Sequence, residues 1–126
     1  MKELSKHSNS IYALLRIVSG ALFSFHGAQK IFGLFASHET ALGSQMWFGG
    51  IIELVCGLCL VLGFKTRIAA FLSSGTMAVA YMQFHWAFRF DENFFPVVNN
   101  GDAAVLYCFL FLYIASKGAG KWSLDK

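Results

Sequence analysis

Ionisable side chains lie inside long apolar runs of this sequence, at His26, Lys30, Glu53 and His85. An imidazole can donate or accept a proton near neutral pH, an ammonium group can stabilise negative charge, and a carboxylate can pair with it or relay protons. A charged group in the middle of a membrane costs on the order of 2.5 to 3.5 kcal/mol, so such residues usually face a protein interior and find partners. The sequence therefore predicts a polar site that binds a small molecule or moves protons.

The composition shows what must surround these residues. Of the 126 residues 56% are hydrophobic and 13% are charged, and the mean hydropathy is +0.55. Soluble domains carry about 25% charged residues. The chain is therefore expected to lie in a lipid bilayer as an integral membrane protein.

Four apolar segments indicate helices that could span the bilayer. A transmembrane helix needs about 20 residues to cross a core about 30 Å thick. The expected fold is all-α, a single-domain four-helix transmembrane bundle over residues 1–126, with helices at about 11–35, 46–64, 68–88 and 100–116. The first helix is expected to be retained rather than cleaved as a signal peptide, because it contains Arg16, lacks a small-x-small cleavage site and continues past twenty residues.

Basic residues distinguish the two ends of this expected bundle. The N-terminal tail, the second connection and the C-terminal tail carry Lys2, Lys6, Lys65, Arg67, Lys117, Lys121 and Lys126. The other two connections hold one basic residue, Arg89, against Glu39, Asp91, Glu92 and Asp102. The positive-inside rule then places both termini in the cytoplasm, in a multi-pass protein of the cytoplasmic (inner) membrane. Because the basic residues are dispersed and form no basic patch, nucleic acid is not expected as a partner.

The expected helix positions bring polar residues of different helices to the same depth. His26 and Lys30 are one helical turn apart, and with Glu53 and His85 they fall in the outer leaflet. If their helix faces meet at the bundle axis, Lys30 pairs with Glu53 and a polar pocket opens toward the outer surface. The candidate site residues are catalytic His26, Lys30 and Glu53, and substrate-binding Gln29, Tyr81, His85 and Asn99, with no metal ligand assigned.

A structural interpretation of the same residues stays open. Lys30 can snorkel to the outer headgroups, His26 and Gln29 can join helices by hydrogen bonds, and a protonated Glu53 can be satisfied by a neighbouring amide. Arg16, about 8 Å from the inner end of its helix, is interpreted as structural and within snorkelling reach of the inner surface.

The second helix carries small residues and cysteines that are interpreted as packing residues. Gly49, Glu53, Cys56 and Gly57 share a face that suits close contact with another helix. The C-x-x-C of Cys56 and Cys59 lies mid-helix in hydrocarbon, where a reactive thiolate is disfavoured, so a redox or metal-binding role is the weaker alternative.

Motifs along nearly the whole chain resemble those of the DoxX family of small membrane proteins. The resemblance rests on HG-x-QK-x-FG at 26–33, WFGG-xx-EL-xx-GL-x-L-x-LG-xx-TR at 47–67, a histidine within 81–86, FFP-xx-N-x-G at 94–101 and G-x-WSLD at 120–125. The resemblance implies a four-helix protein of the bacterial cytoplasmic membrane. It also implies a link to redox chemistry, since members resemble a subunit of a thiosulfate:quinone oxidoreductase or are linked to thiol and oxidative-stress redox. Distant relatives act as assembly factors for other membrane proteins.

Taken together, the residues and the resemblance predict a membrane oxidoreductase component that binds a quinone-like or other small redox substrate in the outer-leaflet pocket. His26 would hydrogen-bond or protonate a carbonyl oxygen, Lys30 would stabilise developing negative charge, and Glu53 would pair with Lys30 and relay protons. The cofactor is left open: a quinone fits, whereas a haem between His26 and His85 is disfavoured because Lys30 and Glu53 would crowd it.

A rival function is that of a non-catalytic assembly or scaffold subunit, so the sequence leaves open whether the protein is an enzyme. The chain carries no recognisable nucleotide, flavin or iron–sulfur motif, so electrons would come from a redox partner subunit or a diffusible reductant. A small-molecule carrier is a weaker alternative, because no inverted repeat is visible. The expected partners are the lipid bilayer, a quinone, and either a redox partner subunit or further copies of the chain.

Overall fold

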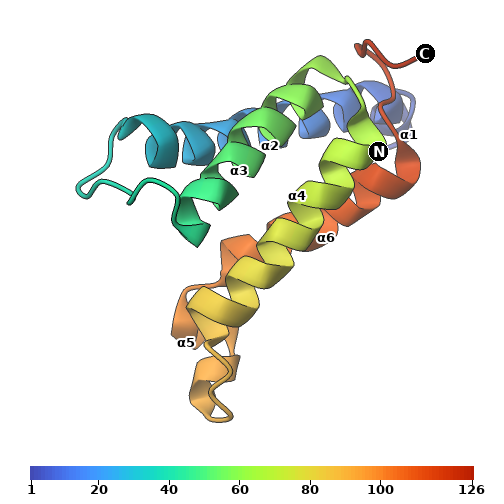
Figure 1. Cartoon of the computed structure of the whole chain (residues 1–126). Helices are drawn as coiled ribbons and strands as arrows, with labels where there is room; N and C mark the ends of the chain where they lie inside the picture. The colour runs from blue at the N-terminus through green and yellow to red at the C-terminus, as the bar shows by residue number, and fades with distance from the viewer.

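The computed structural model describes residues 1–126 and is entirely helical, with no strands (Figure 1). Its longest element is α2, and short helical turns connect α4 to α6. In chain order the elements are α1 (Lys2–Ser5), α2 (Ser8–Phe32), α3 (Gln45–Leu62), α4 (Thr66–Ala80), the π-helix η1 (Tyr81–Trp86), the 3-10 helix η2 (Glu92–Phe94), α5 (Pro96–Asn99) and α6 (Asp102–Lys117).

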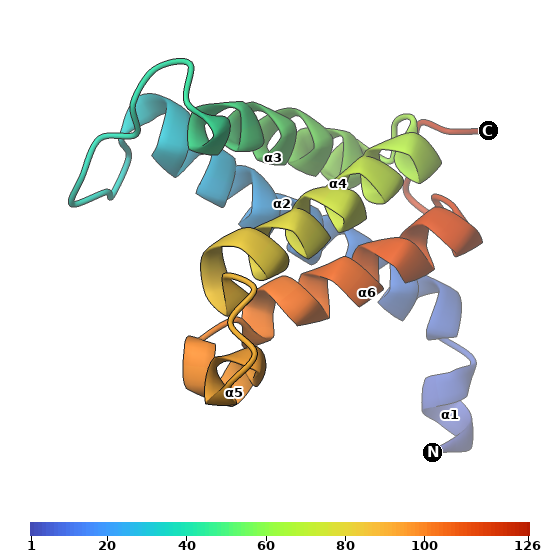
Figure 2. The same cartoon turned by 60° about the horizontal axis from the view of Figure 1, so that its bottom comes forward.

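The helices form two pairs that meet at one end and diverge at the other. Helices α2 and α3 lie side by side and antiparallel, and α4 lies beside α6 (Figures 1 and 2). The start of α2, the turn from α3 to α4 and the end of α6 come together near the C-terminus of the chain. At the opposite end, the loop from α2 to α3 lies far from α5, which closes the other pair.

Glycines bring α2 and α3 into close backbone contact. A Cβ atom added at Gly27 would lie 2.3 Å from the backbone nitrogen of Leu54, and one at Gly57 would lie 2.6 Å from that of Ser24. No side chain fits at such distances, so the contact requires glycine on both helices. The expected small-residue face on α3 is therefore present at Gly57.

The register of this face differs from the expectation at one position. Gly50, rather than Gly49, is buried against α2, where an added Cβ would lie 2.8 Å from the Cβ of Lys30. A Cβ atom added at Gly49 would have no neighbouring atom within 4 Å, so this glycine is not part of the contact with α2. Gly50 and Gly57 are seven residues, about two helical turns, apart and so contact the same neighbour, whereas Gly49 lies about 100° around the helix from Gly50.

The expected helix ends need correction where left-handed residues stop the helices. The first helix ends at Phe32 rather than at residue 35, because Gly33 adopts a φ of 66°. The second ends at Leu62 rather than at 64, with Gly63 at a φ of 64°. Glycine reaches such angles without a steric penalty, so both helices end in the manner typical of a glycine cap.

The last two helices also differ from the expected ranges 68–88 and 100–116. Helix α4 begins at Thr66 and continues into η1, which ends at Trp86. Helix α6 runs from Asp102 to Lys117, and Asn100, at a φ of 58°, separates it from α5. The sequence therefore predicted four long helices in the right places, with their ends displaced by a few residues.

The buried Arg16 ties the C-terminal tail to the α2–α3 pair. Its side chain is 0% exposed and lies inside the protein. It therefore does not extend to the inner membrane surface that the sequence placed within its reach. Its guanidinium donates to the carbonyl oxygens of Leu60 at 3.0 Å, Ala119, Lys121 at 3.0 Å and Trp122 at 2.6 Å. The predicted structural role agrees with these contacts, because a buried guanidinium needs several acceptors.

The same tail caps the start of α4. The Asp125 carboxylate accepts hydrogen bonds from the backbone amides of Lys65 and Thr66, both at 2.8 Å. Hydrogen bonding from Thr66, and then from the Lys65 amide, holds the pKa of the Asp125 carboxyl below its usual range. Nearby, Arg67 donates to the carbonyl oxygens of Ala115 and Ser116 at the end of α6. These contacts hold together the end at which the two helix pairs meet.

The surface of the molecule is apolar. Only 25 of the 126 residues are buried, and large side chains such as Phe25, Leu58, Phe71 and Phe109 are exposed. Helices α2 and α3 are long and apolar enough to cross a membrane, whereas α4 and α6 have 15 and 16 residues. An apolar exterior of this extent suits a lipid environment.

The α2–α3 contact makes a clear prediction for stability. Replacing Gly27 by Ala should push the helices apart and lower the melting temperature in detergent, with a cost of about 1 to 3 kcal/mol for overpacking. Gly75→Ala is the matched control, because nothing lies within 4 Å of a Cβ at Gly75. Thermal unfolding followed by circular dichroism measures both variants. Equal melting temperatures for the two would contradict the close contact.

Candidate functional site

A cavity of about 200 Å³ lies where the two helix pairs diverge, and we call it the polar cavity. It brings together His26, Lys30, Glu53 and His85, which come from α2, α3 and η1. Apolar side chains form the rest of its wall, among them Phe23, Met46, Met77, Phe84 and Tyr107. The four ionisable residues singled out in the sequence thus share one cavity.

The ion pair of Lys30 and Glu53 forms one wall of this cavity. Lys30 Nζ lies 2.6 Å from Glu53 Oε1, which confirms the pairing predicted from the sequence. The side chain of Glu53 is 3% exposed and that of Lys30 is 25% exposed. The close approach of α3 at Gly50 places the Lys30 stem directly against that helix. The pair is therefore fixed by the glycine contact between α2 and α3.

One oxygen of this carboxylate is left without a partner. Glu53 Oε2 is buried and accepts no hydrogen bond from the protein. A buried acceptor without a donor is unfavourable by about 1 to 3 kcal/mol, and more for a charged group. Such atoms are rare in folded proteins and often lie at functional sites.

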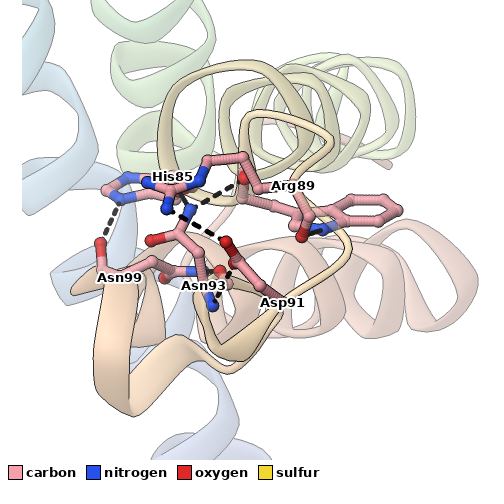
Figure 3. A network of polar contacts seen from close by, with 6 residues as sticks. His85, Arg89, Asp91, Asn93 and Asn99 are labelled. Carbon is pink, nitrogen blue, oxygen red and sulfur yellow. Dashed lines mark hydrogen bonds and ion pairs between the residues drawn. The ribbon is translucent and has the colours of Figure 1, made fainter.

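The π-helix η1 presents His85 to the cavity and fixes its ring. His85 Nδ1 lies 3.2 Å from the main-chain oxygen of Asn99 (Figure 3). Because a carbonyl oxygen only accepts, Nδ1 carries the proton in this contact, and Nε2 of the neutral ring is an acceptor. Asn93 Nδ2 donates to the carbonyl oxygens of His85 and Trp86, at 2.9 and 2.8 Å. π-Helical turns of this kind occur frequently at functional sites.

The loop behind His85 is held by further polar contacts. Asn99 Nδ2 donates to the carbonyl oxygen of Asn93 at 2.7 Å, and Arg89 pairs with Asp91 at 3.0 Å (Figure 3). A hydrogen bond from the Asn93 amide, and next the Arg89 guanidinium, lower the pKa of the Asp91 carboxyl. The loop from η1 to α5 is therefore an ordered support for the His85 ring.

Three of the predicted substrate-binding residues lie outside the polar cavity. Gln29 donates from Nε2 to the Phe35 carbonyl oxygen at 3.2 Å, in the loop after α2. Tyr81 donates to the carbonyl oxygen of Phe94, and its ring stacks on that of His85 with the centroids 6.4 Å apart. Asn99 acts through its main-chain oxygen on His85. Of the substrate-binding set, only His85 lines the cavity.

His26 lines the polar cavity from α2 but differs from the other three residues. Its side chain is exposed, and it forms no hydrogen bond within the protein. A ring that is free of internal partners can change its hydrogen-bonding role with a bound molecule.

Sequence reasoning missed the apolar residues Met46, Phe84 and Tyr107 of the wall, since nothing in an apolar run marks which residue faces a cavity.

An apolar groove adjoins the polar cavity between α3 and α4. Its volume is about 460 Å³, and its walls include Phe48, Ile52, Phe71, Leu72 and Val79. Lys30 and Glu53 line both spaces, so the ion pair stands at their junction. The arrangement can accept a molecule that has a polar head and an apolar chain.

The cysteines lie away from this junction. Cys56 is buried in the core cluster with Leu60 and Ala70, and Cys56, Cys59 and Cys108 are all free thiols. No group of three histidine, cysteine, aspartate or glutamate side chains is placed to hold a metal ion.

Comparison with known proteins identifies the family. The DoxX family model matches residues 11–86, which cover most of α2 and all of α3, α4 and η1. This chain belongs to the DoxX family. A relative from Haemophilus influenzae, described only as an uncharacterized protein, is 40% identical over 129 residues, and the match covers 99% of this chain and 96% of the relative. No solved structure matches the chain. This DoxX protein is therefore a membrane protein.

The ion pair can be tested by a double-mutant cycle. Either Lys30→Met or Glu53→Gln leaves a partner unpaired, which costs about 3 to 5 kcal/mol for a fully buried pair and less here because Lys30 is partly exposed. The double variant should melt at a higher temperature than the less stable single variant, because no unpaired charge remains. Thermal unfolding in detergent measures all four proteins. Losses that simply add would show that the two side chains do not interact.

Proposed function

We propose that this DoxX protein crosses the cytoplasmic membrane four times, with both termini in the cytoplasm. Helices α2 and α3 carry the length and apolarity for two of the crossings. Helix α4 and η1 follow one another without a break from Thr66 to Trp86, which corresponds to about 30 Å at 1.5 Å per residue. Helix α6 is about 24 Å long and supplies the shortest crossing.

The basic residues support this orientation. The segments that carry Lys65, Lys117 and Lys121 lie at the end where the helix pairs meet, joined there by hydrogen bonds. Of the charged residues in the connections at the opposite end, Glu39, Asp91 and Glu92 are acidic and Arg89 is basic. The positive-inside rule assigns the basic end to the cytoplasm and the polar cavity to the outer half of the membrane.

Reporter fusions test this orientation. Fusions after Lys65 and at the C-terminus should show a cytoplasmic reporter, and fusions near Thr40 and Glu92 should show an external one, because the basic segments stay on the inner side. Alkaline phosphatase and green fluorescent protein fusions give opposite signals at each site. An external signal from the C-terminal fusion would contradict the four-crossing arrangement.

For function, we propose a membrane oxidoreductase component that binds a quinone-like redox molecule. The observation that carries this proposal is the buried ion pair at the junction of a polar cavity and an apolar groove. A substituted ring would lie in the polar cavity and an attached hydrocarbon chain in the groove between α3 and α4. Membership in the DoxX family adds support, because the resemblance to that family implies a link to redox chemistry.

The residues around the cavity supply binding and protons. Lys30 donates to a ring oxygen and stabilises negative charge that develops on it, while Glu53 keeps the ammonium in place. His26 and His85 exchange protons with the ring oxygens. Reduction of a quinone to a hydroquinone takes up two electrons and two protons: the electrons come from a partner subunit or a diffusible reductant, and the protons come from water by way of His26 and His85.

A non-catalytic assembly or scaffold role is the second candidate. Exposed aromatic side chains in the loops, such as Phe35 and Phe90, favour it because they offer contact surface to another protein. In that case the ion pair would only hold α2 against α3. The two candidates differ in whether the purified protein binds a small ring on its own.

Binding of duroquinone decides between them. Its four methyl groups block addition of the free cysteines, and quenching of Trp47 and Trp86 fluorescence reports binding to the protein in nanodiscs. His26→Ala should keep the melting temperature within a few degrees and weaken binding about tenfold, because its partner is the bound ring rather than another residue. Cys59→Ala is the control and should bind within a few fold of the unaltered protein.

Two results would contradict the assignment. Absence of saturable quenching would favour the scaffold role. Loss of folding in His26→Ala, rather than loss of binding, would show that this histidine holds the helices together.

A further inference from the structure

The polar cavity presents hydrogen-bond acceptors that have no partner in the protein. Glu53 Oε2 is a buried acceptor without a donor. His85 donates through Nδ1 to the main-chain oxygen of Asn99, which leaves Nε2 of the neutral ring as a second acceptor. Two acceptors therefore have no partner in the protein.

Glu53 Oε2 is the stronger of these two acceptors. The residue is 2% exposed, and the Lys30 ammonium contacts its other oxygen, Oε1. Nearby space is provided by the polar cavity and the apolar groove, both of which Glu53 lines. A bound molecule that brings an O–H group to this carboxylate would satisfy an atom that the fold leaves unsatisfied.

Donors for a bound oxygen come from Lys30 and His26. Lys30 uses one N–H on Glu53 and keeps two for a bound molecule. These two N–H groups do not distinguish a hydroxyl from a carbonyl group on the bound molecule, because the oxygen of either one accepts a hydrogen bond from an ammonium group. His26 does not discriminate either, since its ring has no internal partner and can donate or accept.

We propose that the polar cavity prefers the reduced, hydroquinone form of its ligand over the quinone form. This inference rests on the proposed function, in which a quinone-like ring occupies the cavity. Hydroquinone hydroxyls donate to Glu53 and to His85 Nε2 while they accept from Lys30, whereas quinone oxygens only accept. A site with buried acceptors rejects an analogue that lacks the matching O–H group, because those acceptors are then left unpaired.

The preference has a thermodynamic consequence for the bound couple. Tighter binding of the reduced form raises the two-electron midpoint potential of the bound ring, by about 30 mV for each tenfold difference in affinity. The site thereby favours transfer of electrons to the quinone. The Asn99 carbonyl acts as a positioning group, because it sets which nitrogen of His85 is the acceptor.

Three ligands separate hydrogen bonding from redox state: duroquinone, its hydroquinone, and the dimethyl ether of that hydroquinone, which has no O–H. Binding is measured anaerobically on the full chain in nanodiscs. The hydroquinone should bind at least tenfold more tightly than duroquinone, and the ether should bind no more tightly than duroquinone. His85→Phe keeps a ring of similar size and should reduce the preference by weakening hydroquinone binding alone.

Glu53→Gln should reduce the preference further, because the amide offers a donor as well as an acceptor. Cys59→Ala should retain the full preference. Equal or tighter binding of duroquinone by the unaltered protein would overturn this inference and leave the proposed function standing. Absence of binding by all three ligands would overturn both. If Glu53→Gln does not fold, the ether and His85→Phe still decide the question.

Discussion

The partly buried ion pair between Lys30 and Glu53 is the interaction on which the site depends. The cost of burying the Glu53 carboxylate is offset only when its partner is close and well placed, and here Lys30 Nζ lies 2.6 Å from Glu53 Oε1. That separation requires α2 and α3 to approach closely, which Gly27, Gly50 and Gly57 allow. The glycines and the charges are thus one constraint: a side chain added to the glycine face would also separate the charges.

Most of the site could be predicted from the sequence, because an unpaired charge inside an apolar helix is energetically unfavourable and therefore indicates a partner. A lysine and a glutamate in apolar helices need each other, and helix lengths place them at one depth, so Lys30, Glu53 and the two histidines could be assigned to one pocket. The pairing is confirmed by the structure. The catalytic and binding roles of these residues stay predictions.

The sequence could not predict contacts that run through the main chain. His85 is held by the carbonyl oxygen of Asn99, and Arg16 by carbonyl oxygens more than 100 residues away. Every residue has such an oxygen, so no residue type marks the one that will be used. The same limit explains why Gln29, Tyr81 and Asn99 were assigned to the pocket: their polarity suggested a ligand, whereas the loops nearby satisfy them. No local pattern in the sequence marks the π-helical turn of η1 either, whose last two carbonyl oxygens, those of His85 and Trp86, accept from Asn93.

One end of the molecule holds the two helix pairs together, and the other end keeps them apart around the cavity. At one end, Arg16, Arg67 and Asp125 bind the α2–α3 pair, the α4–α6 pair and the tail to one another through backbone groups. At the other end the pairs diverge, and the space between them holds the polar cavity. A site made of charged groups in an apolar environment tends to collapse or to exclude its ligand if every helix is free to move. Because the closed end fixes how the two pairs are oriented, the open end can keep a cavity while each pair retains its own internal contacts. At the closed end the buried arginine finds carbonyl acceptors on the segments that it joins, and the Thr66 hydroxyl is the one buried side-chain atom there without a partner, whereas at the open end the partnerless atom is a carboxylate oxygen of a residue that lines the cavity, where a ligand is expected to enter.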